Sequence, residues 1–224
     1  MPLKLAILAS GTGTNAQAII DKTKAGLLDV EICLIASNRP NAMVLERAKQ
    51  ANIPAVCVDH TLFPTREAFD AAMLQAITQS GAEAIVLAGY MRILSASFLQ
   101  GFNKPVLNIH PALLPSFPGI HGGADALAYG VKISGVTVHF VDEKMDHGPV
   151  IIQAAVPVKD HDTEDDLMTR IHQMEHRIYP QAIQWLATKR LKITSRQVEL
   201  LQVDAKLSPA GADYFVYPPL EEGF

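Results

Sequence analysis

Short apolar segments alternate with amphipathic ones along the first half of the chain. The apolar runs have the length of strands and lie at residues 3–9, 30–37, 54–59 and 82–90. The segments between them show the spacing of helices, at residues 15–26, 41–52 and 65–81. Continuous apolar strands separated by helices are typical of a parallel sheet that is covered on both faces. The pattern therefore predicts a doubly wound α/β unit.

The rhythm changes in the second half. Two apolar runs at residues 133–142 and 149–158 are joined by the short polar segment DEKMDHG, which is too brief for a crossover helix. We therefore expect an antiparallel strand pair there. A long helix follows, with Thr163 as its N-cap and acidic residues in its first turn, and it is expected to run to about Lys189.

These patterns define the expected fold class. It is α/β, with a doubly wound, mostly parallel sheet of Rossmann-like type and an antiparallel strand pair in the C-terminal half. We expect one domain over residues 1–224, with a nucleotide-binding half over about 1–105, a second half over about 106–195 and a tail over 196–224. The tail is rich in Pro and Gly and is expected to wrap the surface or to be partly mobile.

Composition narrows the range of partners. The formal net charge of −4 and the pI near 6.0 provide no basic face for a phosphodiester backbone, which argues against nucleic acid as a ligand. No apolar stretch is long enough to cross a bilayer, and the apolar run at the start is too short for a signal peptide, so no membrane association is expected. Cys33 and Cys57 lie in apolar runs and are interpreted as buried strand thiols, which favours a reducing, cytoplasmic location.

The first strand runs into a glycine-rich loop, GTGTN, that opens a helix. Gly11, Gly13 and the following amides are suited to bind a phosphate at the helix N-terminus. A tight turn that needs glycine only for its backbone is the simpler alternative. The same residues, with Ala16, also satisfy the dinucleotide fingerprint G-x-G-x-x-A. That alternative predicts an NADP oxidoreductase, with Arg39 on the extra phosphate.

A second group of polar residues lies in the C-terminal half. Residues 106–110 have the pattern of a strand, and alternation puts Asn108 and His110 on one face, about 6.6 Å apart. Asp146 lies in the loop that could bring an acid to this end of the sheet, where a carboxylate would stabilise an imidazolium. An amide, an imidazole and an acid without a Ser or Cys nucleophile suit transfer between two bound substrates.

Two arrangements of histidine could indicate a metal. Residues 172–176 fit the inverted zinc-protease pattern H-x-x-E-H, but a catalytic zinc wants a third protein ligand, and the acids that follow lie mostly in the tail. The spacing of His121, His139 and His147 matches no compact ligand set. We expect no metal site, and interpret these three histidines as supporting, packing or loop residues.

Several longer motifs together resemble the folate-dependent formyltransferases. They are GYMRIL (89–94), LNIHPALLPSFPGIHG (107–122), SGVTVHFVDE (134–143) and DHGPVI (146–151). With the SGTGTN loop, LERA, TREAFD and MEHRIYP, the resemblance is to the phosphoribosylglycinamide formyltransferases within that family, over about residues 3–195. It implies direct formyl transfer from 10-formyltetrahydrofolate to the amine of phosphoribosylglycinamide, in purine biosynthesis, without a metal.

The resemblance also implies roles for individual residues. The catalytic set would be Asn108, His110 and Asp146. The substrate's phosphate and ribose would be held by Gly13, Thr14, Asn15, His172 and Glu175. The folate would be held by Arg66, Met91, Arg92, Ile93, Leu94, Asn108, Asp142, Glu143, Lys144 and Met145, with the two arginines toward its carboxylates.

Other functions remain open at this level. Methionyl-tRNA formyltransferase has related motifs but would need a further RNA-binding domain and a basic surface. A non-catalytic module that binds a nucleotide or folate would keep the loops without the transfer. The expected partners are small molecules, and the sequence does not distinguish a monomer from a homodimer.

Overall fold

The computed structural model describes residues 1–202, 206 and 209–224. The chain consists of two compact units, the first over Met1–Asn108 and the second over Ile109–Phe224. The boundary falls inside strand β5 (Val106–His110). Whether the chain behaves as one domain in solution remains a prediction.

The first unit is a parallel α/β sheet. Its strands are β1 (Leu3–Leu8), β2 (Val30–Ser37), β3 (Ala55–Cys57), β4 (Ala84–Leu87) and the start of β5. They lie in the order β3-β2-β1-β4-β5, and each neighbouring pair is parallel. Leu5, Ile7 and Val86 are completely buried. Strands that are apolar throughout are stable here because helices shield both faces.

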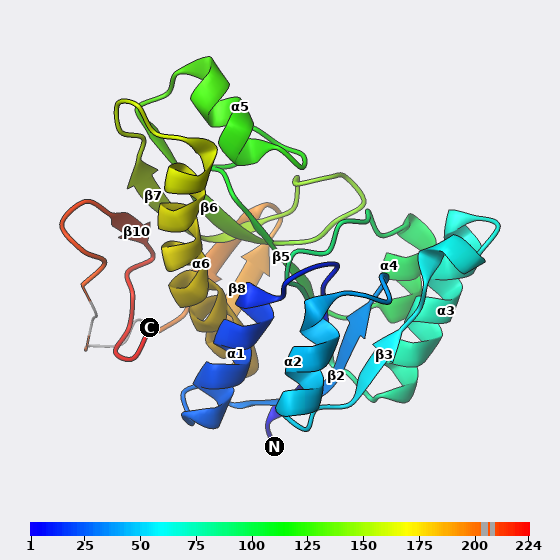
Figure 1. Ribbon diagram of the computed structural model, residues 1–224. Helices are drawn as coiled ribbons and strands as arrows, with labels where there is room; N and C mark the ends of the chain where they lie inside the picture. The colour runs from blue at the N-terminus through cyan, green and yellow to red at the C-terminus, as the bar shows by residue number, and fades with distance from the viewer. Residues whose placement is uncertain (203–205, 207–208) are drawn as a thin grey trace. The chain divides into compact units, whose positions relative to one another are not determined.

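The helices of the first unit follow the winding of its sheet. They are α1 (Thr14–Lys24), α2 (Met43–Gln50), α3 (Arg66–Gln79) and α4 (Ala96–Phe102), with a short 3-10 turn at His60–Leu62. The chain winds outward from β1 to β3, returns to β4 and continues in the opposite direction to β5. Because crossovers between parallel strands are right-handed, α1 and α2 cover one face, and α3 and α4 the other. Figure 1 shows α1 beside α2 and α3 beside α4, pairs that also contact each other.

The second unit combines an antiparallel sheet with a long helix. β6 (Ile133–Phe140), β7 (Val150–Pro157) and β10 (Phe215–Tyr217) lie in the order β10-β7-β6 and are antiparallel. The helices are α5 (Gly122–Tyr129) and α6 (Glu164–Ala187), which contact each other. The mostly parallel, doubly wound fold and the antiparallel pair in the C-terminal half are thus confirmed.

Helix α6 starts as its sequence predicts. The Thr163 side chain accepts from the N–H of Asp166, and the Asp166 carboxylate accepts from the N–H of Thr163, which forms a capping box. Leu167, Ile171 and Ile178 are fully buried on one face of the helix. The helix ends at Ala187, slightly before the expected Lys189.

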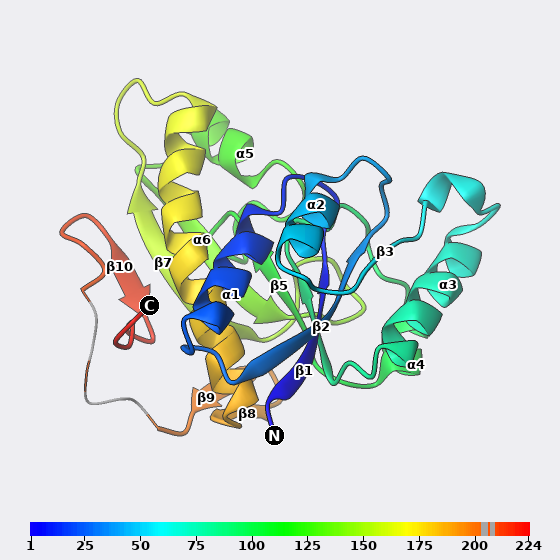
Figure 2. The same cartoon turned by 60° about the horizontal axis from the view of Figure 1, so that its bottom comes forward.

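One expectation needs correction. Cys57 is exposed, because β3 is a three-residue strand at the edge of the first unit's sheet, and Cys33 in β2 is half-buried. The expectation for the tail also covers residues 203–205 and 207–208, which lie outside the described residues, and it stays a prediction. The described part of the segment after Lys189 contains regular structure. It forms a hairpin of β8 (Leu191–Thr194) and β9 (Gln197–Leu200), visible after α6 in Figure 2, and then contributes β10 to the sheet.

Candidate active site

The loops after β1 and β4 meet in the first unit. The backbone N–H of Ser10 donates to Gly89 O at 3.0 Å, and its hydroxyl accepts from the N–H of Met91 at 2.8 Å. That hydroxyl also donates to Oδ1 of Asn38 at 2.5 Å, at the end of β2. Winding reverses between β1 and β4, and this is where open α/β sheets bind ligands. The glycine loop and the segment 89–94 therefore border the expected binding position of this unit.

The glycine loop needs glycine at position 13 for two reasons. Gly13 is the N-cap of α1 with a φ of 71°, a left-handed conformation. A Cβ added there would lie 2.6 Å from Cγ2 of Val44 in α2. Helix α2 also holds the loop through Arg47, whose Nε donates to Thr12 O at 2.7 Å. The N–H groups at the start of α1, including those of Thr14 and Asn15, suit an anion.

Of the two arginines expected to contact folate, Arg66 begins α3 and Arg92 lies against that helix. Nε of Arg66 is 3.9 Å from Oδ2 of the buried Asp70. The guanidinium of Arg92 lies over the ring of Phe69, 4.7 Å from its centroid. Burial, reinforced by the charge of Asp70, raises the pKa of Tyr90. The two guanidinium groups thus lie near adjacent residues of one helix, Asp70 and Phe69.

The segment around Arg92 presents a partly open wall. Met91 and Ile93 are 57% and 53% exposed, whereas Leu94 is buried. Two exposed apolar side chains next to a buried one suit contact with a flat apolar ligand, although exposed apolar residues are common on protein surfaces.

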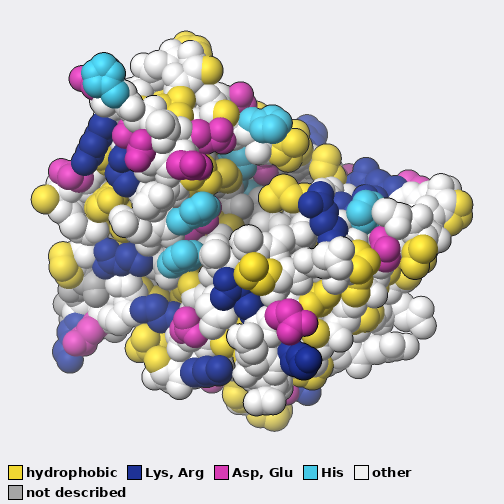
Figure 3. All heavy atoms as spheres, viewed as in Figure 1, with side chains coloured by type: hydrophobic (Ala, Val, Ile, Leu, Met, Phe, Trp, Pro, Cys, Tyr) yellow, Lys and Arg dark blue, Asp and Glu magenta, His cyan; other side chains and the backbone are white. Residues whose placement is uncertain are grey.

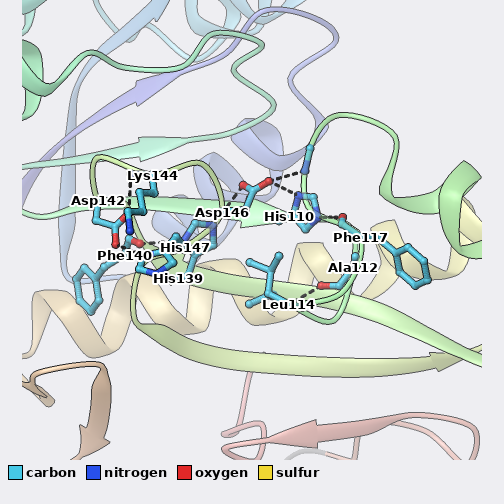
Figure 4. A network of polar contacts seen from close by, with 12 residues as sticks. His110, Ala112, Leu114, Phe117, His139, Phe140, Asp142, Lys144, Asp146 and His147 are labelled. Carbon is cyan, nitrogen blue, oxygen red and sulfur yellow. Dashed lines mark hydrogen bonds and ion pairs between the residues drawn. The ribbon is translucent and has the colours of Figure 1, made fainter.

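His110 ends β5 with both ring nitrogens next to oxygen atoms (Figure 4). Nε2 lies 2.8 Å from Phe117 O, and Nδ1 lies 3.5 Å from Oδ2 of Asp146. A carbonyl oxygen only accepts, so Nε2 carries a hydrogen and Nδ1 faces the carboxylate. Both side chains are largely buried, at 4% and 9% exposed. Asn108 lies two residues before His110 on the same strand and is half-buried.

The Asp146 carboxylate is held from several sides. Oδ2 accepts from the N–H of Gly119 at 2.7 Å, and Oδ1 lies 3.9 Å from Nε2 of His139. The backbone of Asp146 has a φ of 51°, which is uncommon for a residue other than glycine. Burial lowers the pKa of His139, although its bond with Phe140 O and the charge of Asp146 act in the opposite direction. Near neutral pH, His139 is therefore a neutral neighbour of Asp146.

The segment that supplies Phe117 and Gly119 is fixed to the antiparallel strands. The Thr137 hydroxyl donates to Ala112 O at 2.7 Å and accepts from the N–H of Leu114 at 3.0 Å. Nε2 of Gln153 donates to Leu114 O and to the same hydroxyl, both at 3.0 Å. The polar face of β6 and β7 thereby positions the backbone groups that contact His110 and Asp146.

The loop that carries Asp146 is stabilised by hydrogen bonds among its own residues. Asp142 accepts from the N–H of Lys144 at 2.9 Å and from Nδ1 of His147 at 2.7 Å (Figure 4). Partial burial raises the pKa of Asp142, but these hydrogen bonds outweigh it and the pKa is lowered. Arg196, in the β8–β9 hairpin, donates to His147 O at 2.7 Å. Of the other loop residues expected at the pterin, Glu143 is exposed like Lys144, and Met145 is 51% exposed.

The two expected substrate residues on α6 lie together. Nε2 of His172 is 4.0 Å from Oε2 of Glu175, and the carboxylate is buried. The His172 ring stacks on that of His176 with 6.4 Å between centroids. Burial, with a further contribution from His172, lowers the pKa of His176. Among the described residues, no three His, Cys, Asp or Glu side chains form a group that could hold a metal ion.

Several supporting groups were not identified from the sequence. Phe117 O and Gly119 N–H are backbone groups, which no residue pattern reveals. Thr137 and Gln153 belong to strands whose alternation indicates a polar face, but not what that face contacts. His139 was interpreted only as a supporting, packing or loop residue, and it lies buried 3.9 Å from Asp146.

The pattern of the Formyl transferase family matches residues 3–183. The chain belongs to the formyl transferase family. It is 43% identical over 191 residues to phosphoribosylglycinamide formyltransferase of Escherichia coli (strain K12), an alignment that covers 85% of this chain and 90% of that protein. It is 45% identical over 185 residues to a trifunctional purine biosynthetic protein, adenosine-3, of Drosophila melanogaster. That match covers 82% of this chain but only 14% of the longer protein.

Solved structures show the same relationship. Glycinamide ribonucleotide transformylase 1 from Symbiobacterium toebii has a TM-score of 0.88 and 45% identity, with 90% of this chain and 95% of that one covered. Because the chain belongs to the formyl transferase family, we no longer interpret the glycine loop as the fingerprint of an NADP oxidoreductase. No helix among the described residues is both long and apolar enough to span a membrane.

Proposed function

We propose that this formyl transferase moves the formyl group of 10-formyltetrahydrofolate to the amine of phosphoribosylglycinamide, giving N-formylglycinamide ribonucleotide and tetrahydrofolate. The observation that carries the proposal is the largely buried His110–Asp146 pair, fixed by Phe117 O and Gly119 N–H, in a chain of this family. Among the described residues, the partners of the two ring nitrogens of His110 are a backbone carbonyl and a carboxylate, and neither is a hydroxyl or thiol nucleophile. This arrangement suits direct attack of an amine on the formyl carbon, through a tetrahedral intermediate.

Three side chains perform the chemistry in this proposal. Negative charge develops on the formyl oxygen as the amine attacks, and the Asn108 amide and the His110 ring stabilise it. One such donor is typically worth about 3–4 kcal/mol. Asp146 orients the imidazole, and with a bound water it carries the proton from the attacking amine to the departing folate nitrogen.

The remaining expected residues bind the two substrates. Gly13, Thr14 and Asn15 hold the phosphate, and His172 and Glu175 hold the ribose. Arg66 and Arg92 pair with the folate carboxylates, since a guanidinium matches a carboxylate in geometry. The pterin contacts two segments, residues 91–94 and 142–145.

The location, partners and oligomeric state of the enzyme are proposals as well. We propose a cytoplasmic enzyme that acts on two small molecules, binds neither nucleic acid nor membranes, and is a monomer or a homodimer. Figure 3 supports the exclusion of nucleic acid, since Lys and Arg side chains are interspersed with acidic ones on the face shown. Sedimentation of the purified protein will distinguish the two oligomeric states.

The decisive experiment is a transfer assay. Purified protein given phosphoribosylglycinamide and 10-formyltetrahydrofolate is expected to release tetrahydrofolate, and formylated methionyl-tRNA is not expected when that tRNA replaces the acceptor. His110→Ala and Asp146→Asn are each expected to lower kcat by about 10²–10⁴, the usual contribution of a positioned acid or base. Asp160→Asn, in an exposed pair with Lys132, is the matched control. Absence of turnover at micromolar enzyme, or losses confined to KM, would contradict the proposal.

A further inference from the structure

The C-terminal tail binds along one side of α6. The hydroxyl of Tyr214 donates to Oε1 of Gln173 at 3.1 Å. Arg177 donates to three backbone carbonyl oxygens, those of Pro209, Ala210 and Phe224, at 2.8 to 3.0 Å. The tail residues in these contacts lie beyond the residues matched by the family pattern, which ends at residue 183, whereas Gln173 and Arg177 lie within that range.

The tail is also bound further along the helix. Nε2 of Gln181 donates to Pro219 O at 3.1 Å, and its Oε1 accepts from the N–H of Glu221 at 2.7 Å. Just after the helix, Arg190 forms a bidentate pair with the carboxylate of Glu221 at 2.9 and 2.6 Å. The Glu221 and Arg190 side chains are 6% and 16% exposed. Buried, bidentate contacts of this kind fix geometry more firmly than exposed ion pairs do.

These contacts span a weak point in α6. Pro180 lies inside the helix and has no N–H to donate to the carbonyl of His176. A proline in a helix interior loosens or kinks it at this step. Arg177 precedes the proline and Gln181 follows it, and both are bound to the tail. The tail therefore connects the two halves of the helix across the interruption.

The position of these contacts around the helix matters as well. Residues 173, 177 and 181 are spaced by four and share one flank. His172 and Glu175 lie on the opposite flank of the buried face formed by Ile171 and Ile178. Contacts on one flank resist rolling of the helix about its axis, and such rolling would displace the side chains on the other flank.

We infer that residues 209–224 are a positioning element that holds the N-terminal half of α6 in register for substrate. Strand β10 ties the tail to β7, so helix and sheet are linked through it. This inference rests on the proposed function, in which His172 and Glu175 hold the ribose of phosphoribosylglycinamide. The tail itself touches no reacting atom in this scheme.

The test compares tail variants in the transfer assay. The double variant Arg177→Met, Gln181→Leu removes the contacts on both sides of Pro180, and a chain that ends at Gln202 removes the whole tail. Lys192→Met is the control, because its pair with Glu199 is exposed and lies in the β8–β9 hairpin. We expect KM for phosphoribosylglycinamide to rise about tenfold in the double variant, a factor comparable to the loss of one or two hydrogen bonds. We expect kcat and KM for the folate to change less than about threefold.

A second measurement separates this inference from the proposed function. Hydrogen exchange of the backbone amides in residues 168–179 is expected to speed up in the double variant, with the amides of β6 unchanged. If the wild type shows no transfer, the proposed function fails, while exchange still reports whether the tail restrains α6. Unchanged KM and unchanged exchange in the double variant would overturn the inference. Equal losses of kcat with both KM values constant would indicate a smaller folded fraction and would also overturn it.

Discussion

Replacement of Thr137 by Val tests how the sheet supports the candidate active site. The substitution keeps the volume of this completely buried side chain and removes its hydroxyl. The hydroxyl serves two buried backbone groups, Ala112 O and the N–H of Leu114, while Nε2 of Gln153 keeps a second acceptor in Leu114 O. An unsatisfied buried polar group costs about 1–3 kcal/mol. The loss of two partners therefore predicts a destabilisation of roughly 2–6 kcal/mol.

The effect should reach the active site through the chain. The segment that loses its anchors supplies Phe117 O, which bonds His110, so turnover should fall together with stability. Urea unfolding gives the free energy, and the thermal midpoint should fall by about 2–4 °C for each kcal/mol. Thr137→Ser is the matched control, because it keeps the hydroxyl and loses only a methyl group, at a cost of about 1 kcal/mol. A valine variant within about 1 kcal/mol of the wild type, or a serine variant less stable than the valine one, would refute the reasoning.

Three further predictions concern other parts of the molecule. Gly13→Ala should weaken substrate binding by at least tenfold, since φ is 71° and the new Cβ would meet Val44. Isothermal titration checks this, with Gly26→Ala as the control for backbone strain, because Gly26 has a similar φ of 74° but no atom within 4 Å of the added Cβ. Arg196→Ala should lower kcat severalfold, because it releases the His147 carbonyl next to Asp146, and Arg196→Lys should recover part of the loss. Equal activity of the wild type and both variants would exclude a role of Arg196 in positioning this loop. Burial lowers the pKa of His139 in the folded protein, so as pH falls His139 is protonated in the unfolded chain before it is protonated in the folded one. The free energy of unfolding should therefore decline as pH falls below 6.5 and level off below the folded-state pKa. His139→Gln should reduce that acid-side slope in urea titrations at several pH values, and an unchanged slope would show that the decline has another source.

Local chemistry made a large part of this protein predictable. Alternation of apolar strands with helices identified the parallel sheet, because strands shielded on both faces must be apolar along their length. The short connection at residues 142–148 was enough to predict an antiparallel pair, since no helix fits in it. The start of α6 followed from Thr163 and Asp166, which act within one turn. In each case the pattern that identifies the element lies within a short stretch of sequence.

Features that depend on distant contacts were decided only by the tertiary structure. The tail was expected to wrap the surface or be partly mobile. That β10 pairs with β7, and Arg190 with Glu221, is not revealed by composition. Cys57 was expected to be buried, but it lies on an edge strand, and strand order is not encoded by a strand's own residues. The sequence named His110 and Asp146, while the backbone groups that hold them come from Phe117 and Gly119. Carbonyl and amide groups are the same at every residue, so only the folded chain determines which of them meet a side chain.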